Sequence, residues 1–192
     1  MLPTLLVHGI WDDGARFDRL RAALERAGAP RVEALDLWPN DGSAPIERLA
    51  AQVQARADAM GVERIDLVGF SMGALVGRWW LQRMGGRDRV RRFVSISGPH
   101  HGTATAWALS RAGVRQMRPG SPLLADLASD EDPWGEVEVH SIWTPWDLMI
   151  VPPRSSRLRG ARGEHRIGVP LHRWMIRHPE AVSTVVRVLR GA

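Results

Sequence analysis

The stretch "LVGFSMGALVGRWW" (residues 67–80) changes character at a single serine. Leu67, Val68 and Phe70 form an apolar run that is typical of a buried strand. After Ser71, alanine, leucine, valine and tryptophan side chains recur at the spacing of a helix. The stretch therefore predicts a strand, a sharp turn at Ser71 and a helix.

The turn matches the pattern Gly-x-Ser-x-Gly, with Gly69 and Gly73 flanking Ser71. A strand before the motif and a helix after it are the context in which such a serine is a nucleophile. The serine then takes strained backbone angles, and a side chain at either glycine would collide with neighbouring backbone. Its hydroxyl is held beside a helix N-terminus, whose dipole favours developing negative charge. The alternative is an ordinary Gly-Ser turn.

Apolar runs and amphipathic stretches alternate along the chain, which has the length of one domain (1–192). We predict strands over 4–9, 31–38, 64–70, 90–97, 136–143 and 164–170, and helices over 14–28, 45–60, from Ser71, and 179–190. This alternation favours an α/β fold, a parallel sheet with helices on both faces. Residues 99–135 are too long for a routine connection, so we expect an excursion over one sheet edge with one helical piece near 103–112. A small lid is one form that this excursion could take.

The composition restricts the classes of function. The net charge of +5 comes entirely from arginines that are mixed with 21 acidic residues, so we expect no nucleic-acid partner. Cysteine is absent, which excludes disulfides and thiolate chemistry. His100 and His101 are adjacent and no metal-binding motif occurs, so we expect neither metal nor cofactor. The chain starts without a basic leader, and no run approaches the roughly 20 apolar residues of a membrane span. We expect a cytoplasmic protein with at most peripheral contact with a lipid interface.

A serine hydroxyl needs a base to take its proton. In α/β hydrolases the chain order is serine, acid, histidine. Three histidines follow the strand predicted over 136–143, namely His165, His172 and His178. His172 follows the last predicted strand, at the sheet edge that carries Ser71, and we predict it as the base. His165, within that strand, and His178, at the start of the last helix, remain alternatives.

Asp147 lies just past the strand predicted over 136–143, at the same sheet edge. We predict that it holds the tautomer of His172 and stabilises the imidazolium, although a turn aspartate is the plainer interpretation. The tetrahedral oxyanion needs two donors. We predict the backbone N–H of Met72 and that of Ile10, with Trp11 as second choice. His8 is predicted to brace the loop that carries them.

Four motifs together, "VHGI", "GFSMG", "SGPHHGTA" and "WDLMIVPP", resemble bacterial lipases and esterases of the α/β-hydrolase superfamily. The likeness is greatest to the small, nearly lidless type of the Bacillus subtilis lipase. It implies a catalytic triad of Ser71, Asp147 and His172, an oxyanion hole at Ile10 and Met72, and six parallel strands in the order 2-1-3-4-5-6. The chain departs from that type in its "GVPLH" loop and its longer 99–135 excursion.

We therefore predict a serine carboxylester hydrolase that cleaves esters with apolar acyl chains through an acyl-enzyme. The substrate would be a small-molecule or lipid ester, held by four residues near the predicted site: Trp11, Trp146, Met149 and Ile150. An acyltransferase, thioesterase or amidase with the same triad is the first alternative. A non-catalytic binding protein with a hydrolase fold is the second. The oligomeric state is not predicted.

Overall fold

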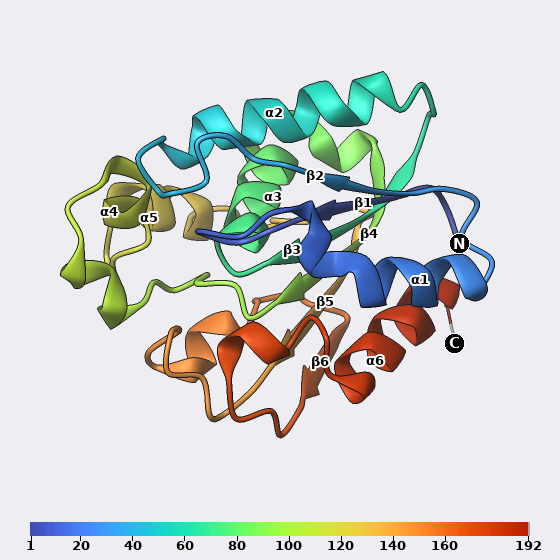
Figure 1. Cartoon of the computed structure of the whole chain (residues 1–192). Coiled ribbons are helices and arrows are strands. Elements are labelled where there is room, and N and C mark those ends of the chain that lie inside the picture. Colours follow the sequence, from blue (N-terminus) through green and yellow to red (C-terminus); the bar gives the residue numbers. More distant parts are fainter. Residues whose placement is uncertain (192) are drawn as a thin grey trace.

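The computed structural model describes residues 1–191, and its centre is a six-stranded sheet in the order β2-β1-β3-β4-β5-β6 (Figure 1). All neighbouring strands are parallel. The strands are β1 (Thr4–Val7), β2 (Val32–Leu35), β3 (Ile65–Phe70), β4 (Val90–Ile96), β5 (Glu138–Trp143) and β6 (Gly163–Arg166). The predicted α/β-hydrolase fold, including its strand order, is confirmed.

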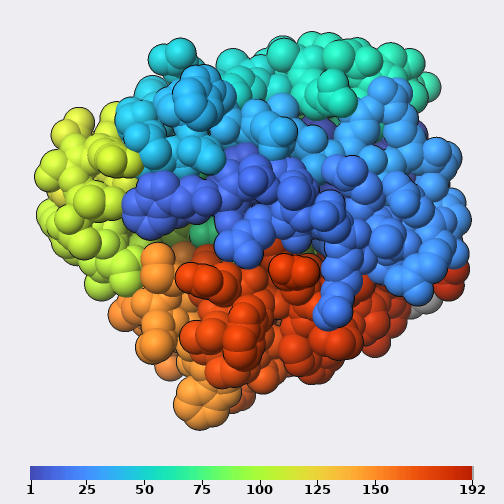
Figure 2. Space-filling model, viewed as in Figure 1, coloured from blue at the N-terminus to red at the C-terminus, as the bar shows by residue number. Residues whose placement is uncertain are grey.

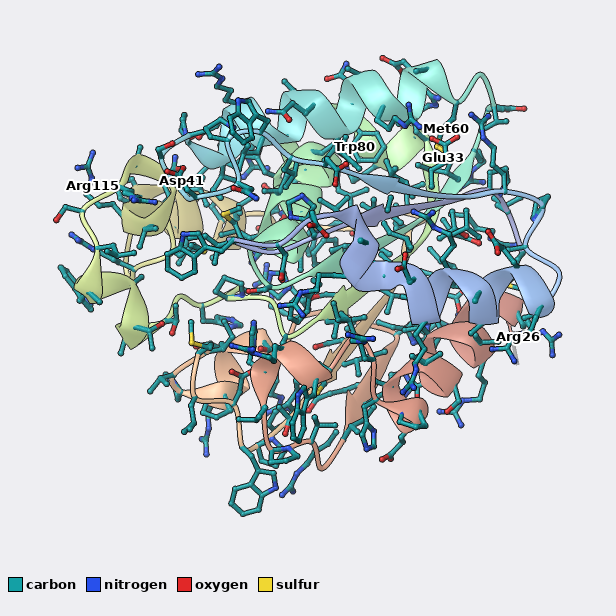
Figure 3. The ribbon with its side chains drawn as sticks, in the orientation of Figure 1. Arg26, Glu33, Asp41, Met60, Trp80 and Arg115 are labelled. Atoms are coloured by element: carbon teal, nitrogen blue, oxygen red, sulfur yellow. The ribbon has the colours of Figure 1, made fainter. Side chains whose placement is uncertain are left out.

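Helices cover both faces of the sheet, as the alternation of elements predicts (Figure 1). One face carries α2 (Ile46–Ala59) and α3 (Met72–Arg83), and the other carries α1 (Asp18–Arg26) and α6 (Pro179–Arg190). Each pair packs its own set of apolar side chains against the strands. Trp80, at 1% exposure, belongs to the layer between α2, α3 and the sheet (Figure 3).

Residues 99–135 contain more helix than the sequence predicts. The piece expected near 103–112 is present as η3 (Ala104–Ala108), but two further helices, α4 (Ala112–Gln116) and α5 (Pro122–Ala128), follow it and were not predicted. They gather at one end of the sheet, and their apolar side chains join the core layer of α2 and α3 (Figure 1). Tertiary packing stabilises helices this short, because an isolated helix of five to seven residues is unstable in water.

Several predicted elements are shorter than expected at their ends. The first strand ends at Val7 instead of residue 9, because the His8 ring and Gly9 belong to the following loop. The last strand spans four residues, Gly163–Arg166, and the first helix is preceded by a 3₁₀ turn, η1 (Gly14–Phe17). Within residues 1–191, no helix has both the length and the apolar character needed to cross a membrane.

The parallel register brings the carboxyl ends of β1, β3 and β5 to one edge. Val7 pairs with Gly69, and Ile96 pairs with both Phe70 and Ile142. The loops that follow these strands therefore meet at the edge where Ser71 follows β3. Figure 2 shows the segment after β1, in blue, bordering orange and red segments near residues 150 and 170.

Candidate active site

Ser71 lies at a strained turn between β3 and α3. Its backbone has φ 54° and ψ −124°, in the region that non-glycine residues rarely adopt. A Cβ at Gly69 would lie 2.5 Å from the Ala74 Cα, and one at Gly73 would overlap the carbonyl oxygens of Val7 and His8. Both flanking positions thus require glycine, as the motif predicts.

His172 and Asp147 form a hydrogen-bonded pair next to this turn. The His172 Nδ1 donates to the Asp147 Oδ2 at 2.7 Å, because an ionised carboxylate only accepts. The other carboxylate oxygen accepts from the backbone N–H groups of Met149 and Ile150, both at 2.9 Å. Asp147 is buried and these three hydrogen bonds fix the orientation of its side chain, so the Nε2 of His172 is the ring nitrogen that remains for a substrate-side partner.

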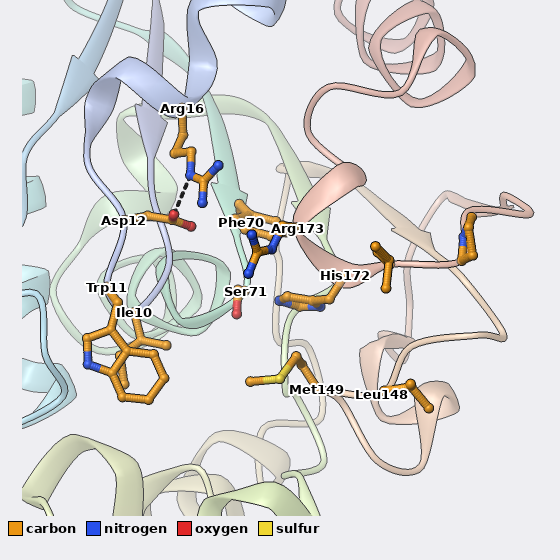
Figure 4. A pocket seen from close by; sticks show the side chains of 12 residues that line it. Ile10, Trp11, Asp12, Arg16, Phe70, Ser71, Leu148, Met149, His172 and Arg173 are labelled. Atoms are coloured by element: carbon orange, nitrogen blue, oxygen red, sulfur yellow. Dashed lines mark hydrogen bonds and ion pairs between the residues drawn. The ribbon is translucent and has the colours of Figure 1, made fainter.

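The His172 ring packs on Phe70, the residue before Ser71, with ring centroids 4.9 Å apart. Ser71 and His172 line one hollow (Figure 4), although no hydrogen bond joins them in the described part of the chain. Such bonds are often long without substrate. His165 instead contacts His140, with Nε2 and Nδ1 3.2 Å apart. Neither His165 nor His178 lines a hollow that contains Ser71.

The loop after β1 approaches Ser71 closely. A Cβ on Gly9 would lie 2.9 Å from the Ser71 Cβ, so only glycine fits there. His8 braces this loop as predicted: its Nε2 accepts from the Leu37 N–H at 2.9 Å and its Nδ1 donates to the Gly9 carbonyl at 2.8 Å. The N–H of Trp11 donates to the Asn40 carbonyl at 2.8 Å, which leaves Ile10 as the better candidate donor.

Met72 is the first residue of α3, where backbone N–H groups have no partner within the helix. Its N–H is therefore a candidate for the second hydrogen-bond donor to the oxyanion.

Two hollows meet at Ser71 and share Ile10, Trp11 and Met149. The apolar hollow, about 190 Å³, is further lined by Thr103, Thr105, Ala106, Ala108, Leu109, Val114, Met117 and Ile150. The polar hollow, about 410 Å³, is further lined by Asp12, Arg16, Phe70, Leu148, Pro170, Leu171, His172 and Arg173 (Figure 4). A group held at Ser71 thus has an apolar space on one side and, on the other, a mixed space that also presents the charged side chains of Asp12, Arg16 and Arg173.

The two threonines do not make the apolar hollow polar. The Oγ1 atoms of Thr103 and Thr105 both donate to the Met149 carbonyl at 2.7 Å. The Thr103 Oγ1 also accepts from the Val151 N–H at 2.9 Å. These bonds tie the start of the 99–135 excursion to the loop that carries Asp147.

The model of the family described as palmitoyl protein thioesterase matches residues 3–146, well over half of the chain. The chain belongs to this family. It is also 31% identical over 121 residues to the triacylglycerol lipase of Pseudomonas fragi, covering 58% of this chain and 39% of the lipase. A homoserine O-succinyltransferase of Xanthomonas campestris is 40% identical over 92 residues, covering 44% of this chain and 24% of that enzyme. The chain thus aligns with well under half of either curated relative.

Aspergillus fumigatus lipase B has the same fold as this thioesterase-family chain. The two superpose with a TM-score of 0.83 at 18% identity, over 98% of this chain and 52% of the lipase. The expected resemblance to lipases and esterases of the α/β-hydrolase superfamily is confirmed, and the family is named for the thioesterase reaction, one of our alternatives.

The structure brings most of the predicted substrate-binding residues of this family member to the hollows. Trp11 and Met149 line both, and Ile150 lines the apolar one. Trp146, at 63% exposure, lines neither hollow. Sequence reasoning missed Gly9, although the "HG" dipeptide carries a signal for it, and it missed Arg173, for which no motif exists.

A buried polar network joins α3 to the 99–135 excursion and to β4. Arg78 donates to the His100 carbonyl at 3.1 Å and to the Leu127 carbonyl at 2.7 Å. Burial lowers the pKa of Arg78 to about 10. Burial, followed by the nearby charge of Arg78, also holds the pKa of His100 well below its usual range. His100 is therefore neutral, and its Nε2 bonds the Ser95 hydroxyl at 2.6 Å.

Proposed function

We propose that the chain is a serine hydrolase that cleaves carboxylic esters and thioesters of apolar acyl chains through an acyl-enzyme on Ser71. One observation carries the proposal. The Ser71 turn lies where the His172–Asp147 pair and the apolar hollow meet. Lipid esters and thioesters are the substrate class that fits such an arrangement.

In the acylation step the Ser71 Oγ attacks the acyl carbonyl carbon while the His172 Nε2 takes the hydroxyl proton. The carbonyl oxygen becomes an oxyanion, for which the N–H groups of Ile10 and Met72 are the proposed donors. His172 then gives its proton to the departing alcohol or thiol, and the acyl group stays on Ser71. Asp147 keeps its negative charge throughout and stabilises the imidazolium.

Water completes the cycle. It attacks the acyl carbonyl carbon as the His172 Nε2 takes one of its protons, and the second tetrahedral intermediate releases Ser71. His172 returns that proton to the Ser71 oxygen, and the free acid leaves. An added alcohol or thiol in place of water would give acyl transfer, which the succinyltransferase similarity makes a second candidate.

A fluorophosphonate probe tests the nucleophile. We expect stoichiometric labelling of the wild type, and loss of labelling and of octanoyl-ester and octanoyl-thioester hydrolysis in Ser71→Ala. Removing a triad nucleophile lowers turnover by about 10⁶. His172→Ala should be as damaging, whereas His165→Ala, outside both hollows, should stay active.

Ser97→Ala is the matched control, because Ser97 also has a positive φ (48°), follows the neighbouring strand β4 and is buried. This variant should label and turn over like the wild type. Labelling that persists in Ser71→Ala would overturn the proposal. Product analysis with added glycerol separates the two candidates, since free octanoic acid means hydrolysis and octanoylglycerol means transfer.

A further inference from the structure

The polar hollow is lined by one cation, Arg173, that has no direct partner within residues 1–191. The Nε of Arg16 donates to the Asp12 Oδ1 at 2.6 Å, so these two charges compensate each other. The guanidinium of Arg173 makes no hydrogen bond or ion pair with any residue in the described range 1–191. The charged side chains that line the hollow, Asp12, Arg16 and Arg173, thus sum to +1, while the Asp147 carboxylate lies behind the His172 ring, 2.7 Å from its Nδ1.

Arg173 follows the predicted base directly, in the 3₁₀ turn η5 (His172–Trp174). Its side chain extends from this turn toward Ser71 (Figure 4), and the backbone that fixes His172 also fixes the position of Arg173. By contrast, no charged residue lines the apolar hollow on the other side of Ser71. The two sides of the nucleophile thus differ in charge as well as in shape.

An acyl carbonyl at Ser71 has two substituents, the acyl chain and the leaving group. An apolar chain is more stable in the apolar hollow, because each buried methylene is removed from water. The leaving group must then lie in the polar hollow, within reach of Arg173. A guanidinium presents a planar set of donors that matches a carboxylate or a phosphate.

We infer that the preferred substrates are acyl esters or thioesters whose alcohol or thiol carries an anionic group, a carboxylate or a phosphate, and that Arg173 selects them. This inference rests on the proposed function. The proposed function specifies only the acyl chain, and this inference adds a negative charge on the alcohol or thiol leaving group.

Three octanoyl thioesters with small leaving groups test the inference: those of mercaptoacetate, mercaptoacetamide and thiocholine, which are anionic, neutral and cationic. The measurement is kcat/KM for each with the wild type, Arg173→Gln, Arg173→Lys and Arg177→Gln. Arg177 is exposed, four residues along the chain, and lines neither hollow, so it is the matched control.

For each protein we divide kcat/KM for the anionic mercaptoacetate thioester by kcat/KM for the neutral mercaptoacetamide thioester. The decisive quantity is the quotient of this ratio in the wild type and the same ratio in the variant. Intrinsic thioester reactivity cancels in this quotient, and so does any effect of Arg173 on the basicity of His172. We expect a quotient of about five for Arg173→Gln, since ion pairs at exposed sites have this strength, and about one for Arg177→Gln. Arg173→Lys should restore part of the preference, and added salt should reduce it.

A second pair, octanoylglycerol phosphate and octanoylglycerol, distinguishes a phosphate from a carboxylate as the recognised anion. A preference that depends on Arg173 in either pair supports the inference. A quotient of one in both pairs, with Ser71-dependent hydrolysis intact, overturns the inference alone. Hydrolysis that survives in Ser71→Ala overturns the proposed function instead.

Discussion

Replacing Ala106 by leucine should shorten the acyl chain that the enzyme prefers. Ala106 is buried and lines the apolar hollow of about 190 Å³. A cavity of about 150 Å³ holds benzene, so this hollow accommodates roughly six to eight carbons. Leucine adds three carbon atoms at this position and displaces about three methylenes of the chain. At about 0.8 kcal/mol for each methylene, octanoyl esters lose about 2.4 kcal/mol of binding, or about sixtyfold in kcat/KM.

The assay is kcat/KM for p-nitrophenyl esters from acetyl to dodecanoyl. Acetyl esters do not reach Ala106 and should be hydrolysed at the wild-type rate, which also reports that the variant is folded. Ala104→Leu is the control, because Ala104 lies on the same 3₁₀ helix η3 but is exposed and outside the hollow. Should Ala106→Leu not fold, Ala108→Leu fills the hollow from an exposed position. An unchanged chain-length profile in a folded filling variant would refute the assignment of this hollow to the acyl chain.

Two further predictions concern charged pairs. Asp147→Asn should lower kcat by about 10⁴ with little change in folding, because an amide no longer fixes the His172 tautomer; kcat within tenfold of the wild type would contradict this. Arg83 lowers the pKa of Asp130 in the folded protein through a hydrogen bond of 2.8 Å. The pair therefore stabilises the fold at pH values above the pKa of this carboxyl in the unfolded chain. This stabilisation is lost as the pH falls through the pKa of Asp130 in the folded protein. Arg83→Gln should therefore lower the Tm at neutral pH and approach the wild type in acid, as calorimetry over a pH series would reveal; an equal Tm difference at all pH values would contradict the assignment.

The sequence predicts elements best where local chemistry marks both ends. The helix over 179–190 is predicted to the residue, because Pro179 occupies its first position and Gly191 ends it with a positive φ of 80°. Within 99–135, α5 has a marked start, where the Ser121 hydroxyl caps it and Pro122 occupies its first position, but its C-cap Ser129 gives no comparable stop signal. These short helices depend on packing against α2 and α3, which the local sequence does not encode.

The same distinction applies to the candidate site. Chain order alone predicts that Asp147 and His172 lie close together, because parallel strands bring the loops after β5 and β6 to one edge. The direction of a loop side chain is set by backbone angles that composition does not encode. Trp146 therefore faces solvent against expectation, and Arg173 lines the polar hollow without any signal in the sequence.

The apolar hollow and the polar hollow are built from different parts of the chain, and this has an evolutionary consequence. Apart from the residues they share and Ile150, the apolar hollow is lined by residues between 103 and 117. The polar hollow is lined by Asp12 in the loop after β1, Arg16 in η1, Phe70, Leu148 and residues 170–173. Mutations in the 103–117 segment can change which acids are accepted while leaving the alcohol or thiol preference untouched. Selection can therefore act on the two halves of a substrate separately: exchange of the one contiguous segment 103–117 would change the accepted acid, whereas a new alcohol or thiol preference needs changes in several separate segments.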